Sequence, residues 1–309
     1  MRHSPLFIVH CSFFLLLTTN AIRDLRDYFL VWPRQDMVRY LYRADYREAA
    51  HYLNAHPEIA NVAVSSALLG PWDRLALDVD TRREDVAVRL FNAERVLIWT
   101  VEDAPSLVLL TSYPPPPPAI SDLLKAVPSL PTAISPGLTL YTLPPISTLQ
   151  SPLRIPHSAF RIPLARFANG LELIETRWTT EPPLAPGQEA VLLTTWHVPG
   201  PLDLPPLPIV PNPPPPGVYS GPRLAVFIHV LAGDGTSLTG DDGLWVDPLT
   251  LRPGDRFIQF HHLTLSPGAT SGPYVLELGL YDPYTGERWA VLDATGQPVS
   301  DRIVIPAAE

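Results

Sequence analysis

One stretch near the C-terminus constrains the fold more than any other, because it joins a strand pattern to an explicit turn. Between Tyr274 and Tyr281, leucines alternate with other residues at the two-residue period of a β-strand. Residues 282–286, Asp-Pro-Tyr-Thr-Gly, favour a turn: aspartate can bond its own backbone, proline presets φ, and glycine accepts a positive φ. Residues 288–292 then return to an extended pattern. The sequence therefore predicts a β-hairpin over residues 274–292.

Proline restricts what the rest of the chain can form. It supplies 39 of the 309 residues, well above its usual share of about 5%. This favours short strands joined by stiff loops over long helices. About seven to nine strands at such spacing predict an immunoglobulin-like or jelly-roll-like antiparallel β-sandwich over residues 157–309. The expected strands are 159–167, 171–178, 190–198, 223–232, 244–248, 256–265, 274–281, 288–292 and 302–305, with an exposed proline-rich loop over 199–222.

A different pattern precedes the sandwich, because helical and strand-like segments alternate within residues 34–145. This order predicts a small α/β domain, followed by a proline-rich linker over residues 146–156. The expected elements are helices 45–56 and 120–127, a buried strand 59–66, a strand pair 86–91 and 96–101, and strands 107–111 and 138–143.

The end of the first strand is the place where an open α/β sheet would bind a ligand. Ser65, Ser66 and Asp73 follow that strand. Neither a Gly-x-Gly-x-x-Gly fingerprint nor a Walker-type Gly-Lys-Ser/Thr occurs in the sequence. We therefore expect no cofactor.

The N-terminus is apolar. Arg2 and His3 precede an apolar run over residues 6–17, and the small residue Ala21 follows it. Residues 1–21 therefore predict a signal peptide or a membrane anchor, although the run is short against the ~20 residues that span a bilayer. The end of a final transmembrane helix that begins upstream, or a buried N-terminal helix, is an alternative. The signal peptide, the membrane anchor and the end of a transmembrane helix all place the rest of the chain outside the cytoplasm, where it would be anchored or secreted. The buried helix does not.

Residues 22–33 predict an amphipathic connector helix with charged and apolar faces, which ends at Trp32-Pro33. Such an arginine- and aromatic-rich segment could lie at a membrane surface, or serve as a plain connector.

Charge and cysteine content exclude several classes of function. The formal net charge is −9, so we expect no nucleic-acid partner. Cys11 is the only cysteine and excludes an intrachain disulfide and a cysteine-based metal site. Lys125 is the only lysine, and we interpret this excess of arginine as an effect of codon composition.

Two groups of side chains could hold a metal ion. Aspartates near glycine-rich turns are weak calcium candidates, although turns themselves use aspartate; these residues are Asp234, Asp241, Asp242 and Asp247. His229, His261 and His262 suggest zinc, but adjacent histidines on one strand point to opposite faces. We expect no metal site.

Catalytic signatures are lacking. Glu172, Glu175 and Glu277 supply carboxylates, but nothing selects them above surface charge, and no Gly-x-Ser-x-Gly occurs. Aromatic rings on a sandwich can stack on sugars, although a core role is the commoner one. The candidates for sugar stacking are Trp178, Trp245, Tyr284 and Trp289.

Several segments together resemble a known family. They are residues 26–32, 40–45 with 49–54, 62–66, 227–231 with Asp234-Gly235, 252–255 and 279–288. The chain resembles the C-terminal extracytoplasmic region of bacterial membrane glycosyltransferases of the dolichyl-phosphate-mannose mannosyltransferase and aminoarabinose-transferase type, which are family 39-like. In that family a many-helix membrane domain transfers sugar from a polyprenyl-phosphate donor, and the soluble tail follows its last helix. The family's catalytic acid lies in the membrane domain, which has no counterpart in this sequence, so the resemblance carries over no catalytic residue.

Two hypotheses follow. The first is a non-catalytic extracytoplasmic accessory or tail domain pair related to membrane glycosyltransferases, which binds glycan or a membrane partner. The alternative is an independent extracytoplasmic carbohydrate-active enzyme whose carboxylates the sequence does not identify.

Overall fold

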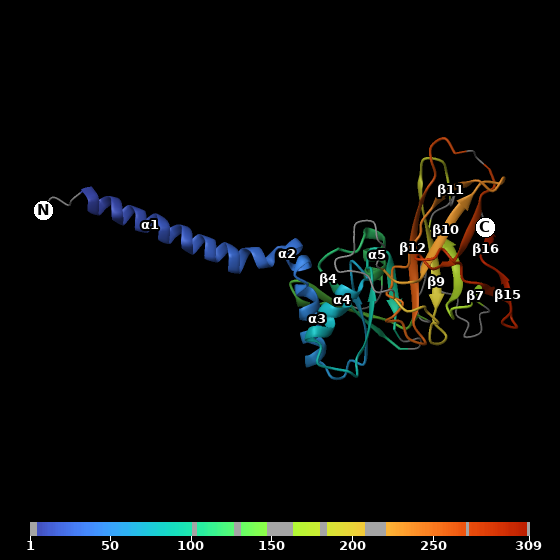
Figure 1. Ribbon diagram of the computed structural model, residues 1–309, viewed down its shortest axis with the longest axis horizontal. Helices are drawn as coiled ribbons and strands as arrows, with labels where there is room; N and C mark the ends of the chain where they lie inside the picture. The colour runs from blue at the N-terminus through green and yellow to red at the C-terminus, as the bar shows by residue number, and fades with distance from the viewer. Residues whose placement is uncertain are drawn as a thin grey trace.

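The structure, a computed structural model, is mostly β-sheet with a few helices (Figure 1). It describes residues 5–100, 104–126, 131–146, 163–179, 184–207, 221–269 and 272–307. The helices are α1 (Pro5–Arg26), the π-helical turn η1 (Asp27–Val31), the 3-10 turn η2 (Trp32–Arg34), α2 (Asp36–Leu41), α3 (Ala44–Ala55), α4 (Pro71–Asp80) and α5 (Pro118–Ala126).

A five-stranded mixed sheet has the order β2-β1-β4-β6-β5. Its strands are β1 (Asn61–Ser65), β2 (Ala87–Phe91), β4 (Ser106–Thr111), β5 (Thr132–Ser135) and β6 (Leu138–Leu143). The central strand β1 runs parallel to both β2 and β4, whereas β6 is antiparallel to β4. Alternate residues of β1 pack in two different hydrophobic cores. Val62 and Val64 pack in a smaller core with α3 and α4, and Ala63 packs in a larger core that includes α5.

Two further sheets are built mainly from the C-terminal half. A seven-stranded sheet has the order β15-β14-β7-β8-β9-β12-β3, and a four-stranded sheet has the order β11-β10-β13-β16. Their strands are β3 (Val96–Trp99), β7 (Ala165–Phe167), β8 (Glu172–Trp178), β9 (Glu189–His197), β10 (Ala225–Leu231), β11 (Ser237–Gly240), β12 (Arg256–Thr264), β13 (Val275–Tyr281), β14 (Val291–Leu292), β15 (Pro298–Ser300) and β16 (Ile303–Pro306).

Strand β3 links the two halves of the chain. It pairs antiparallel with β12, from Trp99 opposite Arg256 to Val96 opposite Gln259. The predicted pairing of segments 86–91 and 96–101 is therefore wrong, because β2 belongs to one sheet and β3 to the other. All four residues of β3 are buried, so its side chains are covered on both faces. A single large core contains residues of both predicted regions.

Buried ion pairs reinforce this junction. Arg89 on β2 donates from Nε to Oδ2 of Asp255 at 2.9 Å and from Nη2 to Oδ1 at 2.9 Å. Both side chains are almost wholly buried. Thr250 accepts the backbone N–H of Leu90 at 3.1 Å, which adds a second polar link. These bonds connect residues about 160 positions apart, so the sheets are built as one unit.

The same kind of pair recurs wherever a carboxylate is buried. Among the described residues, every buried carboxylate pairs with an arginine: Asp45 with Arg39, Asp73 with Arg43, Asp247 with Arg74, Asp255 with Arg89, Glu277 with Arg288, and Asp282 with Arg223. A guanidinium suits such sites better than an ammonium, because its planar donors match a carboxylate and it is weakly hydrated. Codon composition alone is thus an incomplete account of the arginine excess.

Of the β-hairpin predicted over residues 274–292, only the turn forms as expected. Asp282 accepts the N–H of Tyr284 at 2.9 Å, Gly286 has φ 74°, and Tyr281 bridges Arg288. Beyond the turn the strands part. β13 already pairs with β10 and β16, so both its edges are filled, and β14 instead extends the seven-stranded sheet beside β7.

Other predicted elements differ in detail. Segment 244–248 forms only an isolated bridge, between Val246 and Phe91. Helix α4 and the strands β5, β11 and β15 have no counterpart among the predicted elements. The linker, apart from Ile146, lies outside the described residues, as do 159–162 of the first predicted sandwich strand and 208–220 of the predicted loop.

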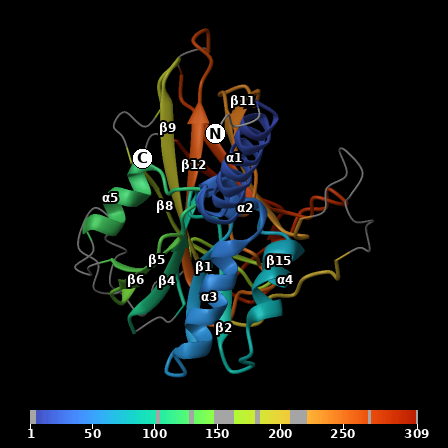
Figure 2. The ribbon, with the colours of Figure 1, turned by 90° about the vertical axis from the view of Figure 1, so that its left-hand side faces the viewer.

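Helix α1 projects away from the body and continues into η1 and α2 without packing on a sheet (Figure 1). Viewed from that side, α2, α3 and α4 lie behind it in front of the sheets (Figure 2). Within the part of the chain that the structure describes, no helix combines the length and apolarity needed to cross a membrane.

Removing one partner of the central buried pair tests the junction. We expect Arg89→Met to lower the free energy of unfolding by about 3–5 kcal/mol, because it leaves the buried Asp255 uncompensated. The double variant Arg89→Met/Asp255→Leu should recover most of this loss. Urea unfolding measures both, with Lys125→Met, from an exposed pair, as the control. If Arg89→Met lowered the free energy of unfolding as little as the control does, the Arg89–Asp255 pair would not hold the junction.

Candidate functional site

The carboxyl edge of the parallel strands β1 and β4 is the candidate site, because strands in open sheets present ligand sites there. Ser65 ends β1 and Thr111 ends β4. Their hydroxyl oxygens lie 2.8 Å apart, and Ser65 Oγ also accepts the N–H of Thr111 at 2.8 Å. Both side chains are buried, so these hydroxyls are committed to each other.

Asp73, fully buried in the first turn of α4, forms one half of this edge. Its Oδ2 accepts the hydroxyls of Ser66 at 2.6 Å and Tyr46 at 2.9 Å, and its Oδ1 lies 2.9 Å from Arg43 Nε. Burial raises the pKa of Tyr46, and the neighbouring Asp73 carboxylate adds to the shift. The phenol therefore stays a hydrogen-bond donor.

Asp45, in the first turn of α3, forms the other half. It accepts Arg39 Nε at 2.9 Å and Nη2 at 2.6 Å, and Ser112 Oγ at 2.9 Å. Partial burial disfavours the guanidinium charge, but hydrogen bonds to Glu48 and Asp45 outweigh this and raise the pKa of Arg39. Gly137 lies against this pair, so closely that a Cβ atom would collide with both side chains.

These contacts serve to hold helices. Asp45 and Asp73 stand in the first turns of α3 and α4, where a carboxylate is favourable at the positive end of the helix dipole. Each is bound by an arginine from the segment that joins α1 to α3. Arg39 and Arg43 thus hold the segment between α1 and α3 against this edge of the sheet. The hydroxyls and carboxylates of the edge are themselves bound by neighbouring groups.

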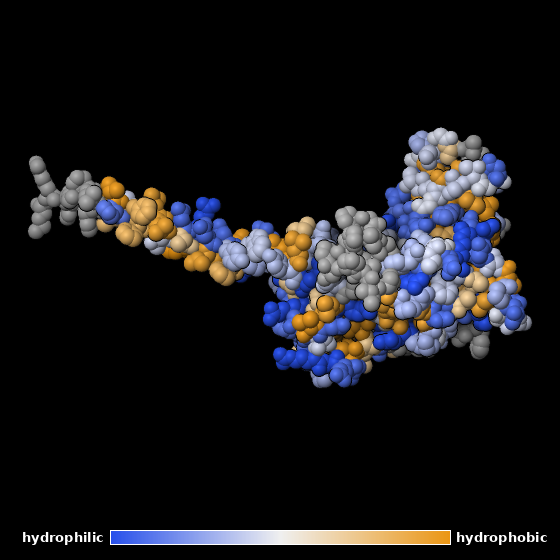
Figure 3. Space-filling model, viewed as in Figure 1, coloured by the Kyte–Doolittle hydropathy of each residue, from blue (hydrophilic) through white to orange (hydrophobic). Residues whose placement is uncertain are grey.

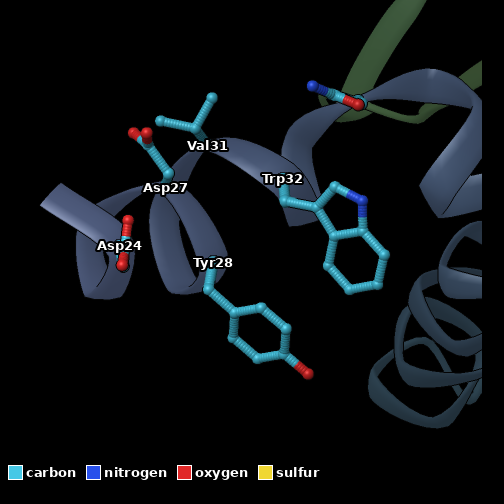
Figure 4. Close-up of a pocket in the computed structure, with 6 residues that line it drawn as sticks. Asp24, Asp27, Tyr28, Val31 and Trp32 are labelled. Carbon is cyan, nitrogen blue, oxygen red and sulfur yellow. The ribbon is translucent and has the colours of Figure 1, made fainter. Parts of the chain in front are cut away.

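An open hollow of about 470 Å³ lies where α1 turns toward the body. It is lined by Asp24, Asp27, Tyr28, Val31, Trp32 and Gln35 (Figure 4). The rings of Tyr28 and Trp32 stack with centroids 5.4 Å apart at 19°. The carboxylate of Asp27 is partly neutralised by Arg26 at 3.3 Å and Arg23 at 3.6 Å. The hollow is aromatic on one side and acidic on the other.

The four weak calcium candidates do not converge. Asp234 caps its own turn by accepting the N–H of Thr236, and Asp242 lies 3.3 Å from His229. Asp241 binds Arg95 at 3.1 Å, and Asp247 lies 3.2 Å from Arg74. Among the described residues no group of three or more His, Cys, Asp or Glu side chains is arranged to hold a metal ion.

His261 is a fully buried histidine that lies between a threonine and an aspartate. It is fully buried on β12, with Nε2 3.0 Å from Thr194 Oγ1 and Nδ1 3.5 Å from Asp241 Oδ2. Thr194 Oγ1 also accepts the indole N–H of Trp196 at 2.8 Å. Burial lowers the pKa of this histidine. The order Thr-His-Asp resembles that of a hydrolytic triad, but Thr194 and His261 are closed to any substrate.

The four sugar-stacking candidates are all partly covered. Trp178, Trp245 and Trp289 pack against the larger core, and Arg95 lies over the ring of Trp245. Tyr284 donates its hydroxyl to the carbonyl of Gly221 at 3.1 Å, with Arg223 beside its ring. Trp178 lies on β8, whereas Trp245, Tyr284 and Trp289 lie outside the strands.

Sequence reasoning placed Ser65, Ser66 and Asp73 at a strand end, as the structure does, but missed their partners Tyr46, Arg43 and Thr111. The i, i+4 spacing of Tyr28 and Trp32 on a helix was the signal that could have located the hollow.

Neither the comparison with protein-family models nor the search of curated proteins finds a match for this sequence.

The buried histidine predicts a pH dependence of stability. Its pKa in the folded state lies below its ordinary value of 6.5, so the unfolded chain takes up a proton that the folded chain does not. Stability is therefore present above about pH 6.5 and lost as the pH falls below it, by up to ~1.4 kcal/mol per pH unit. Urea unfolding at two pH values measures the loss, and His261→Gln should reduce it. The exposed His51→Gln is the control. If His261→Gln lost as much stability on acidification as the unchanged chain, His261 would not be the source of the pH dependence.

Proposed function

We propose that this chain is a non-catalytic accessory or tail module of a membrane glycosyltransferase, held at the outer face of a membrane by residues 6–17. In this proposal the seven- and four-stranded sheets form the immunoglobulin-like or jelly-roll-like sandwich, and the body binds a membrane partner. The relation to glycosyltransferases rests on the sequence resemblance, and the membrane role rests on helix α1.

The exposure of α1 carries the proposal. Within residues 9–17 of α1, six apolar side chains are 54–69% exposed: Val9, Phe13, Phe14, Leu15, Leu16 and Leu17. Five of them are consecutive, so at about 100° per residue they cover every side of the helix. An apolar surface of this kind in water is unfavourable and marks an interaction site. Since it faces all directions, a surrounding apolar medium fits it better than a single flat partner.

The length of the run sets how deep it can go. Twelve residues rise by about 18 Å as a helix, against about 30 Å for the hydrocarbon core of a bilayer. We therefore propose insertion into one leaflet.

The base of the helix has the composition of a membrane interface. Tyr28, Phe29 and Trp32 are exposed there, with Arg23 and Arg26 one turn earlier. Tyrosine and tryptophan favour the headgroup level, and arginine extends toward water. Neither glycan binding nor independent catalysis has a comparable observation behind it, because the aromatic candidates are packed and each buried carboxylate described has an arginine partner.

Vesicle binding tests the proposal. The full chain should float with neutral phosphatidylcholine vesicles, and Phe13→Ser/Leu16→Ser should weaken binding by at least about 100-fold, since two large apolar side chains are lost. Val299→Ser/Val304→Ser changes two exposed side chains of the C-terminal strands and should leave binding unchanged. Failure of the unchanged chain to float, or equal binding by the α1 variant, would refute the membrane role.

A further inference from the structure

A second exposed apolar surface lies on α4. Trp72, Leu75 and Val79 are 43%, 53% and 72% exposed, and Leu68 just before the helix is also exposed. On a helix, residues 72, 75 and 79 fall within an arc of about 60°. We call these four residues the α4 stripe. It is continuous along the helix, unlike the single exposed apolar residues that are normal on protein surfaces.

The packing of α4 does not need this stripe. The helix is held by the buried Leu77 and Asp73, and by Arg74, which pairs with Asp247. All three point away from the stripe by helical periodicity. An α4 with serine or glutamine at the stripe positions would keep its contacts with α3 and the core. Fold stability therefore gives no reason for the apolar residues.

The position of the stripe indicates what covers it. α4 lies on the side of the body from which α1 projects, in both views (Figures 1 and 2). Hydrophobic surface appears along α1 and again on the body over α4 (Figure 3). A membrane entered by α1 would therefore meet the helix layer of the body before either C-terminal sheet.

We infer that the α4 stripe is a second membrane contact, which seats the body on the bilayer surface entered by α1. This inference rests on the proposed membrane role of α1. A tryptophan beside leucine and valine on one helix face is suited to the boundary between headgroups and acyl chains. The exposed Asp78 lies beside the stripe, about 60° around the helix from Leu75, and the net charge is −9. The lipid surface is therefore zwitterionic, because an anionic one would repel this face.

The single cysteine allows a direct test. Cys11 is exposed on α1, so the unchanged chain can carry one environment-sensitive fluorophore there. Two further full-length proteins carry the label elsewhere: Cys11→Ser/Leu75→Cys on the stripe, and Cys11→Ser/Val299→Cys on β15 as a control. Each is mixed with phosphatidylcholine vesicles with and without brominated lipid. We expect a blue shift and bromine quenching at positions 11 and 75, and neither at 299.

The outcomes separate the two claims. Insertion at 11 with position 75 still in water overturns the inference and leaves the proposed function standing. No change at 11 refutes the proposed function, whatever happens at 75. A shift at 75 that appears without vesicles as the protein is concentrated assigns the stripe to a second copy of the chain and overturns the inference. Trp72→Gln/Leu75→Gln/Val79→Gln should in addition weaken vesicle binding by at least about tenfold without changing the urea midpoint.

Discussion

The pairing of β3 with β12 is the constraint on which the rest of the structure depends. It places a strand from the N-terminal half at the edge of a sheet built from the C-terminal half. Once β3 is placed there, β2 must end beside residues 245–247, where Asn92 and Asp247 exchange backbone hydrogen bonds with Trp245 and Leu90. One face of the five-stranded sheet then packs against the larger core, and its other face packs against α3 and α4. The two halves thus form one body with a helical side and a sheet side.

Buried arginine–carboxylate pairs hold this arrangement at its polar points. Desolvating two charges costs about as much as their attraction returns, so such pairs are weak sources of net stability. Breaking one is costly, however, and each pair joins segments that would otherwise be free to slide. Arg89 with Asp255 fixes the junction between sheets, while Arg39 and Arg43 fix the segment that leads out to α1. The pairs of Arg39 and Arg43 thus hold α2 and the turn after it against the first turns of α3 and α4.

Local patterns in the sequence predicted most strands near their observed positions, including β8, β9, β10, β12 and β13. Pairing was not predictable in the same way, because it depends on contacts between distant residues. The 274–292 turn has ideal local chemistry, yet its two strands enter different sheets since both edges of β13 are occupied. The 92–95 turn likewise separates β2 from β3. The excess of arginine resembles a compositional bias in the sequence, but in the structure six arginines pair with buried carboxylates. At the site, Asp73 was visible as a strand-end residue, but its contacts with Tyr46 and Arg43 come from a preceding helix and carry no sequence motif.

Native-state hydrogen exchange tests most directly whether the two halves form one body. If β3 and the buried pairs unite them, amides of β1 and β4 and amides of β9 and β12 should exchange with the same free energy of opening, and denaturant should lower both in parallel. We expect one shared free energy of opening across the three sheets. A five-stranded sheet that opens at a clearly lower free energy while β9 and β12 stay protected would contradict it.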